Sequence, residues 1–149
     1  MNNVTWNIKN FEDLSTKELY KILKVRQEVF IVEQTCYYLD ADGYDDKALH
    51  IWAETNGEIA AYCRIFSQGI KYQETSIGRV LTNTKYRNLK LGKTLINIAL
   101  QAIETHFKTS ECRISAQDYL LEFYKSFGFE DTGKKYLEDD IPHTEMVRK

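Results

Sequence analysis

The sequence predicts a mixed α/β fold, with a mostly antiparallel central sheet flanked by about four helices. Short runs rich in β-branched and aromatic residues alternate with segments whose apolar residues recur every three or four positions. In addition, Asn56-Gly57 joins two strand-like runs, and this dipeptide is typical of a tight antiparallel hairpin. The length of 149 residues predicts a single domain, residues 1–149.

The first predicted elements are an edge strand, residues 5–8, and a helix. Ser15 is the expected N-cap of that helix, and Glu18, three positions later, completes a capping box. An apolar face then continues to about Glu33. Arg26 interrupts this face, either as a side chain that reaches solvent at its edge or as a cation that lines an acceptor cleft.

The segment 35–48 has no periodicity and is rich in aspartate around Gly43. It is not an EF-hand, because aligning Gly43 with the loop glycine places Tyr38 and Leu49 at ligand positions. Two interpretations remain, an acidic loop in solvent or a negative rim that attracts a protonated amine. The aspartates concerned are Asp40, Asp42, Asp45 and Asp46.

Further strands and helices follow in an alternating order. Residues 77–82 are expected to form a strand that leads into a long helix beginning near Leu91. The other expected elements are strands 49–55, 58–66, 112–116, 134–137 and 143–147 and a helix over 118–127. The predicted order is therefore β-α-loop-βββ-α-β-α-ββ, with right-handed crossovers.

The junction between the strand at 77–82 and the following helix is a predicted anion site. A strand that enters a helix through such a turn points free backbone N–H groups and the positive end of the helix dipole at one place. A side chain at Gly92 would hold the backbone away from a ligand. The residues of the junction, Arg87, Lys90, Gly92, Lys93 and Thr94, therefore predict a phosphate or pyrophosphate site.

The same residues partly match a P-loop, because Gly92-Lys93-Thr94 forms the end of that motif. The first glycine of the motif would fall at Arg87, so this loop cannot wrap phosphates as a P-loop does. No acidic strand end suited to Mg²⁺ stands out downstream, and no metal site is predicted. The plainest alternative is a strand, a turn and a helix with solvated lysines.

Two motifs resemble those of the GNAT acetyltransferase superfamily. Residues 86–93, YRNLKLGK, resemble the [QR]-x-x-G-x-[GA] loop that binds the pyrophosphate of coenzyme A; Lys90 replaces the first glycine. Residues 117–129, QDYLLEFYKSFGF, resemble the closing helix N-x-x-A-x-x-[FL]-Y-x-x-x-G-F. Tyr124 and Gly128-Phe129 are in place there, whereas Gln117 and Leu120 replace asparagine and alanine.

Three further features resemble the ElaA-like branch of this superfamily. They are the run Arg26-x-x-Val29-Phe30-x-x-Glu33-Gln34, the aspartate-rich loop after it, and Ile141-Pro142-His143. The resemblance covers nearly the whole chain. It implies a GNAT-like fold and an N-acetyltransferase in which an amine attacks acetyl-coenzyme A directly in a ternary complex.

The resemblance also implies which residues hold the cofactor. Tyr124 would act as the general acid that protonates the leaving thiolate; the alternative is a core tyrosine packed among phenylalanines. Backbone groups at residues 80–82 would pair with the pantetheine arm, and the loop at residues 87–94 would bind the pyrophosphate. The implied cofactor-binding residues are Val80, Leu81, Thr82, Arg87, Asn88, Leu89, Lys90, Leu91, Gly92, Lys93, Thr94, Gln117 and Tyr124.

No general base is evident, and three residues are candidates: His50, His143 and Glu33. A lone histidine is more often held by structural hydrogen bonds, and bulk water is a further alternative. The acceptor cleft is expected between the segment 26–46 and the turn at 141–145. An arginine in its wall would favour an acceptor that also carries a carboxylate or phosphate. The expected acceptor-binding residues are Arg26, Phe30, Glu33, Asp45, Asp46 and His143.

Composition narrows the partners. A net charge of −2 predicts no nucleic-acid footprint, and no apolar run is long enough to span a bilayer. The start of the chain does not resemble a secretory signal, so a cytoplasmic protein is expected. The cysteines Cys36, Cys63 and Cys112 lack metal or redox spacing and are expected to be reduced packing residues.

The predicted acceptor is a small-molecule amine or a peptide amino group, and a homodimer is left open. The lack of a cysteine placed as a nucleophile favours direct attack over a covalent intermediate. Because Lys90 and Gln117 depart from the family pattern and no base is evident, one alternative function remains. This is a non-catalytic module that binds coenzyme A or a protein partner on the same scaffold.

Overall fold

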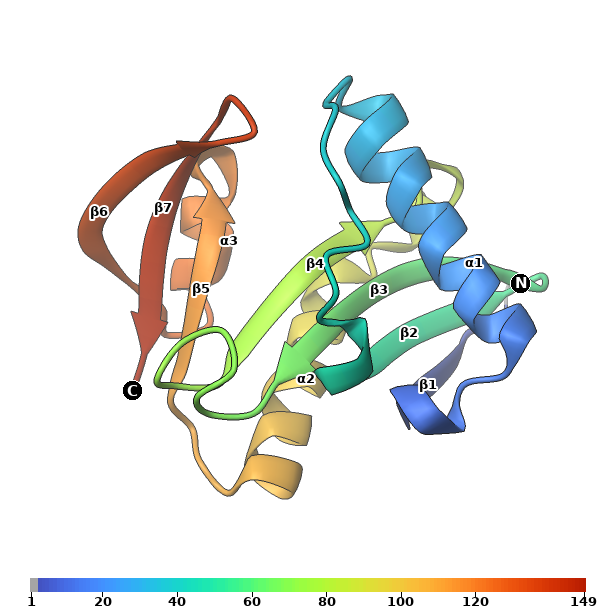
Figure 1. The fold of residues 1–149 in the computed structure, drawn as a ribbon, viewed down its shortest axis with the longest axis horizontal. Helices are drawn as coiled ribbons and strands as arrows, with labels where there is room; N and C mark the ends of the chain where they lie inside the picture. Colours follow the sequence, from blue (N-terminus) through green and yellow to red (C-terminus); the bar gives the residue numbers. More distant parts are fainter. Residues whose placement is uncertain (1–2) are drawn as a thin grey trace.

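The computed structural model describes residues 3–149 and shows the predicted order of elements (Figure 1). The strands are β1 (Thr5–Asn10), β2 (Leu49–Thr55), β3 (Glu58–Phe66), β4 (Ser76–Thr82), β5 (Cys112–Gln117), β6 (Glu130–Glu138) and β7 (Ile141–Arg148). The helices are α1 (Thr16–Arg26), its π-helical continuation (Gln27–Glu33), α2 (Gly92–Phe107) and α3 (Leu121–Lys125). Short 3-10 helices lie at Phe11–Asp13, Asp45–Lys47, Thr84–Leu89 and Asp118–Leu120.

The strands form two antiparallel ladders. One has the order β1-β2-β3-β4, and the other has the order β5-β7-β6. They meet where a parallel bridge joins Thr75, just before β4, to Cys112 at the start of β5. Beyond that bridge β4 and β5 separate, so that the two ladders open as a V (Figure 1). The fold class predicted from the sequence is confirmed, and the central sheet is divided at β4 and β5.

Helices α1 and α2 cover opposite faces of the first ladder. Ile22 and Val25 of α1 pack with Trp52, Tyr62 and Leu81 in one hydrophobic cluster. The larger cluster includes the apolar side of α2 and continues under α3 and β5 into the second ladder. The core thus holds the two arms of the V in a fixed relation while the space between β4 and β5 stays open.

Local signals explain where several elements begin and end. The side chain of Ser15 accepts a hydrogen bond from the Glu18 N–H, and the Glu18 carboxylate accepts one from the Ser15 N–H, which confirms the capping box. Asn56 and Gly57 have φ values of 52° and 74°, as the predicted hairpin turn requires.

The C-terminal elements differ from the prediction in length. The closing helix is shorter than the expected 118–127, since α3 ends at Lys125 and Gly128 then adopts a φ of 91°. Strands β6 and β7 are longer than expected, because pairing with each other extends them past their apolar residues. Much of β6 is exposed, so its hydrophobic pattern is weak.

Strand β4 contains a bulge beside the opening of the V. Its register against β3 shifts after Tyr62, so that Arg79 and Val80 lie opposite the single residue Cys63. Arg79 has a φ of 52°, in the left-handed region that L-residues rarely adopt. The bulge reverses the facing of the strand, because Ile77 belongs to the cluster with α2 while Leu81 belongs to the cluster with α1.

All three cysteines are buried free thiols, as expected. Cys63 and Cys112 belong to the larger hydrophobic cluster. Within residues 3–149, no helix combines the length and the apolar character that a bilayer-spanning segment needs.

Candidate active site

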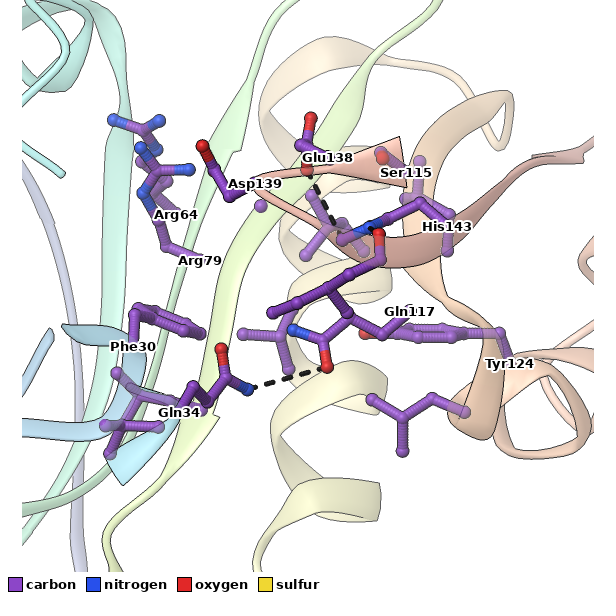
Figure 2. Close-up of a pocket in the computed structure, with 18 of the residues that line it drawn as sticks. Phe30, Gln34, Arg64, Arg79, Ser115, Gln117, Tyr124, Glu138, Asp139 and His143 are labelled. Carbon is purple, nitrogen blue, oxygen red and sulfur yellow. Dashed lines mark hydrogen bonds and ion pairs between the residues drawn. The ribbon is translucent and has the colours of Figure 1, made fainter. Parts of the chain in front are cut away.

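A cavity of about 730 Å³ lies in the opening between β4 and β5. Residues 76–82 of β4 line one side, and Ile114, Ser115 and Gln117 of β5 line the other. The π-helical segment, β3, α3, and the turn between β6 and β7 with the start of β7 also contribute to the walls (Figure 2). This volume falls within the range of small-molecule sites in proteins, which is about 300–1,000 Å³.

The predicted pyrophosphate loop lies at one end of this cavity. The 3-10 helix Thr84–Leu89 ends at Lys90, whose φ of 54° turns the chain into α2. Helix α2 begins at Gly92, and its N-cap Leu91 supplies no side-chain hydrogen bond. The first N–H groups of α2 therefore point outward without an internal acceptor, as an anion site requires. Of the loop residues named from the sequence, Arg87 and Gly92 line the cavity.

Gly92 is not required by the packing of the protein itself. A Cβ at this position would lie 3.8 Å from Phe123 Cζ and 4.0 Å from Thr82 Cγ2, which are ordinary contact distances. The fold therefore has room for alanine, so a need for glycine at this position has to come from a ligand that approaches the backbone.

Arg87 is held in place by Glu33 across the mouth of the cavity. Its Nη1 and Nη2 atoms lie 2.6 and 2.8 Å from the two Glu33 oxygens, and Nη2 also donates to the Thr82 carbonyl. Hydrogen bonding by Arg87 lowers the pKa of Glu33. Glu33 lines the cavity, but a carboxylate already neutralised by a bidentate arginine is a poor proton acceptor.

Tyr124 lies in the wall formed by α3, with its ring edge-on to those of Phe123 and Phe129 (Figure 2). The side chain is 5% exposed, and burial raises the pKa of its phenol. The phenol therefore remains protonated at neutral pH and is able to donate a hydrogen bond into the cavity. The two interpretations of Tyr124, a core residue and a residue of the site, are thus compatible. Its ring packs against phenylalanines, and the residue also lines the cavity.

His143 of β7 also lines the cavity. It pairs in register with Gln117 of β5 on one side and with Tyr136 of β6 on the other, and its ring stacks on that of Tyr136. Nδ1 lies 2.7 Å from the Ile141 carbonyl, and Nε2 lies 3.3 Å from a Glu138 oxygen (Figure 2). A carbonyl only accepts hydrogen bonds, so Nδ1 carries the hydrogen and Nε2 carries the lone pair when the ring is neutral.

His50, the first of the three candidate bases, does not line the cavity. The ring is completely buried between the Tyr62 hydroxyl, 2.7 Å from Nδ1, and the Asp45 carbonyl, 2.9 Å from Nε2. Burial lowers its pKa. Both nitrogens are occupied by structural partners, so a proton acceptor for a substrate is not available here.

Three residues expected to bind the acceptor, Arg26, Asp45 and Asp46, also lie outside the cavity wall. Arg26 is 0% exposed, with Nε 2.8 Å from Asp40 and Nη1 2.6 Å from Asp45. Most of the aspartate-rich loop is therefore neither solvated nor a negative rim. The carboxylates of Asp40, Asp42 and Asp45 are neutralised by arginines, which the loop sequence alone does not reveal.

Several wall residues were missed by the sequence reasoning. Gln34 donates to Gln117 at 3.5 Å across the cavity (Figure 2), and the Cys36 thiol contacts the Asp139 carbonyl at 3.3 Å. Charged residues inside otherwise apolar strands were the available signal for two of the missed residues, Arg64 in β3 and Arg79 in β4. The other missed polar residues of the wall are Tyr38, Asp42, Lys71, Tyr72, Ser76, Ser115, Tyr119, Glu138 and Asp139.

The predicted contributions of β4 and of Phe30 are compatible with the structure. Val80, Leu81, Thr82, Gln117 and Phe30 all line the cavity. The remaining loop residues predicted to bind the cofactor, Asn88, Leu89, Lys90, Leu91, Lys93 and Thr94, lie next to it rather than in its wall. Within residues 3–149, no cluster of three or more histidine, cysteine or carboxylate side chains is arranged to hold a metal ion.

Comparisons with known proteins place this fold and this cavity in one family. A family model for the acetyltransferase (GNAT) domain matches residues 13–149. A UPF0039 protein of Synechocystis sp. is 37% identical over 145 residues, which cover 97% of this chain and 94% of that protein. Protein ElaA of Escherichia coli is 36% identical over 148 residues, which cover 98% and 97% of the two chains.

Solved structures of similar proteins agree with this family match. The crystal structure of an acyl-CoA N-acyltransferase from Pseudomonas aeruginosa has a TM-score of 0.93 at 38% identity, covering 99% of this chain and 100% of that one. The crystal structure of E. coli ElaA has a TM-score of 0.88 at 35% identity, covering 97% and 99%. The family match and the shared fold thus identify an acyltransferase. The chain belongs to the acetyltransferase (GNAT) family, among the relatives named ElaA and UPF0039.

Proposed function

We propose that residues 1–149 form a single N-acetyltransferase domain that uses acetyl-coenzyme A. It transfers the acetyl group to a primary amine by direct attack in a ternary complex. The observation that carries the proposal is the cavity itself, which joins an uncapped helix N-terminus at Gly92 to a wall containing Tyr124 and His143. The fold of an acyl-CoA N-acyltransferase from P. aeruginosa supports the choice of cofactor class.

The cofactor would lie along the opening of the V. Its pyrophosphate would accept hydrogen bonds from the first N–H groups of α2, beside Arg87. The pantetheine arm would follow residues 80–82, whose edge is not paired with β5 beyond the bridge at Thr75. The bulge at Arg79 interrupts the pairing of β4 with β3 beside the opening, and a backbone N–H left free there would polarise the thioester carbonyl.

His143 is the proposed general base. The Ile141 carbonyl fixes the hydrogen on Nδ1, which leaves the Nε2 lone pair beside Glu138 for the ammonium proton. The deprotonated amine nitrogen then attacks the carbonyl carbon, the carbon–sulfur bond breaks, and its electron pair stays on sulfur. The products are the N-acetylated amine and the free thiol of coenzyme A.

Tyr124 would donate its phenolic hydrogen to the leaving sulfur. Its raised pKa makes complete transfer to a thiolate unfavourable, since free thiols titrate near about 8.5. We therefore assign Tyr124 the role of a hydrogen-bond donor that stabilises the thiolate. The proton released by the amine completes the thiol.

A covalent acetyl-cysteine intermediate is not part of this proposal. Burial raises the pKa of all three thiols, and raises that of Cys112 to about 12. Cys36 is the cysteine in the cavity wall, and its thiol contacts the Asp139 carbonyl. A protonated, hydrogen-bonded thiol is a weak nucleophile.

The test is release of free thiol from acetyl-coenzyme A in the presence of a panel of primary amines and peptides. The proposal predicts amine-dependent release together with a mass increase of the amine that corresponds to one acetyl group. Cofactor binding without release for any amine would instead support the non-catalytic module as the function. Acetylation of the protein itself during turnover would contradict direct attack.

A further inference from the structure

Two arginines and a lysine form one wall of the cavity. Arg64 of β3 and Arg79 of β4 lie across the cavity from Ser115 and His143 (Figure 2), and Lys71 also lines the cavity. The segment 26–46, from which acceptor contacts were expected, supplies Phe30, Glu33 and Asp42 to other parts of the cavity wall, whereas Arg26 lies outside that wall. Arg79 is therefore placed where Arg26 was predicted, with 22% of its side chain exposed.

These cations belong to a closed network of ion pairs with one positive charge in excess. Each carboxylate is shared between two or more cations, and the shortest contact joins Arg64 to Asp42 at 2.5 Å. Four cations against three carboxylates leave a net charge of +1. The members are Arg26, Arg64, Lys71 and Arg79 with Asp40, Asp42 and Asp45. Arg64, which is 2% exposed, retains an Nε without a hydrogen-bond partner among residues 3–149.

The bulge in β4 is the reason why Arg79 belongs to this network. In an uninterrupted strand, Arg79 would share the face of Ile77, which is buried in the cluster under α2. The left-handed φ of 52° turns it instead toward Asp40, which lies 2.9 Å from its Nε. A non-glycine residue in this region stores conformational strain, and such strain is concentrated at functional sites.

The opposite end of the cavity carries the other charge. Glu138 and Asp139, from the turn between β6 and β7, line it together with His143. The cavity is therefore positive at Arg79 and Lys71 and negative at the turn. Glu33 and Arg87 neutralise each other. The electric field that an acceptor meets is therefore determined by the positive end of the cavity, at Arg79 and Lys71, and by the negative end, at Glu138 and Asp139.

Building on the proposed N-acetyltransferase function, we infer that the acceptor is an amine that also carries a carboxylate, and that Arg79 binds this carboxylate with help from Lys71. The ammonium group then lies toward Glu138 and His143, where the base is. A surplus of one positive charge matches a carboxylate, whereas a phosphate dianion would exceed it. A polyamine would place a second ammonium group against the arginines, which is repulsive.

The experiment compares acceptors that differ only in the carboxylate. Each set contains an amino acid, its primary amide and the corresponding decarboxylated amine, for example phenylalanine, phenylalaninamide and phenethylamine. The measured quantity is the ratio of kcat/KM for acid and amide, in the wild type and in Arg79→Gln. The intrinsic reactivity of each amine is the same for both proteins, so it cancels when the two ratios are compared.

The wild type should prefer the acid, and Arg79→Gln should lower the ratio by roughly ten- to a hundredfold, which is the range for a lost charge-assisted hydrogen bond. Arg79→Lys should restore part of the preference. Lys71→Gln removes a cation outside the strand, should lower the ratio less, and serves if Arg79→Gln does not fold. Lys125→Gln is the matched control, because Lys125 pairs with Glu122 on the surface and should leave the ratio unchanged.

Different outcomes separate this inference from the function on which it rests. A wild type that turns over amides or simple amines as well as acids overturns the carboxylate site and leaves the N-acetyltransferase function standing. An unchanged ratio in a folded Arg79→Gln variant does the same. If no amine of any kind is acetylated, both the inference and the proposed function are overturned.

Discussion

Tyr124 is the residue whose role is most directly separable from its packing. Tyr124→Phe removes one hydroxyl and keeps the ring between Phe123 and Phe129. We expect turnover to fall roughly ten- to a thousandfold with little change in cofactor affinity, within the range for loss of a hydrogen bond to a developing negative charge. Single-turnover kinetics should be used, so that product release does not hide the chemical step. Unchanged chemistry would show that Tyr124 serves only the core.

His143 should be needed when the acceptor arrives as an ammonium ion. His143→Gln removes the proposed base, and we expect kcat/KM near neutral pH to fall on the order of a hundredfold or more. Activity should recover as the pH is raised, because solvent then supplies the deprotonated amine. Loss of cofactor binding in the same variant, measured by calorimetry, would mean that His143 is structural. Glu138→Gln, which keeps the shape of the neighbouring side chain, should show a milder loss with the same pH trend.

Gly92 tests whether the backbone at the start of α2 contacts a ligand. Gly92→Ala should fold normally, because the added Cβ meets its neighbours at 3.8 and 4.0 Å and alanine favours helix. We expect about tenfold or greater weakening of coenzyme A binding, with an unchanged or slightly higher melting temperature. Equal cofactor affinity in the variant and the wild type would contradict the proposed pyrophosphate site.

At the scale of elements, the start of β2 and the loop before it should make stability depend on pH. Burial lowers the pKa of His50 below its ordinary value of 6.5. As the pH falls below that value, the unfolded chain binds a proton at His50 that the folded protein does not accept. The free energy of unfolding should therefore decrease, with a limiting slope of about 1.4 kcal/mol per pH unit for this group.

Urea unfolding at pH 7.5 and 5.5 measures this dependence. His50→Gln retains polar contacts toward Tyr62 and the Asp45 carbonyl without a titrating ring, so the decrease between the two pH values should be smaller than in the wild type. Asp42 and Asp45 have lowered pKa values and lose their contribution only as the pH falls through values below 3.8, outside this window. Equal decreases in both proteins would contradict the assignment.

Elements were predictable to the extent that their signals are local. The capping box at Ser15, the Asn56-Gly57 hairpin and the strand that leads into α2 were all evident from the sequence, because neighbouring residues determine them. The bulge at Arg79 was not, since it depends on the register between β3 and β4. A sequence pattern records alternation, but it does not record which residue is left unpaired.

In the candidate site, too, features determined by neighbouring residues were predictable, and features determined by the tertiary fold were not. The loop containing Gly92 and the helix containing Tyr124 were located from their motifs, whereas Arg26, Asp45 and Asp46 lie outside the cavity in which acceptor contacts were expected. Acidic residues in a loop indicate solvent exposure on average, and nothing local reveals that Arg64 and Arg79 neutralise Asp42. Pairs between residues far apart in sequence depend on the tertiary fold.

At the scale of the whole molecule, the account depends on one geometric feature, the separation of β4 from β5. The shared core fixes both arms of the V, and the bridge between Thr75 and Cys112 closes one end. The cavity of about 730 Å³ is the consequence, and every proposed contact with cofactor and acceptor lies along it. The central claim is therefore that this opening binds coenzyme A.

Isothermal titration calorimetry of the purified protein with coenzyme A tests this claim most directly. The account predicts saturable binding of one cofactor per chain with a dissociation constant in the micromolar range, roughly −8 kcal/mol. The affinity should be lower in Gly92→Ala and nearly unchanged in Tyr124→Phe. Absence of binding at cofactor concentrations on the order of hundreds of micromolar would contradict this claim. Such a result would mean a binding free energy weaker than about −5 kcal/mol.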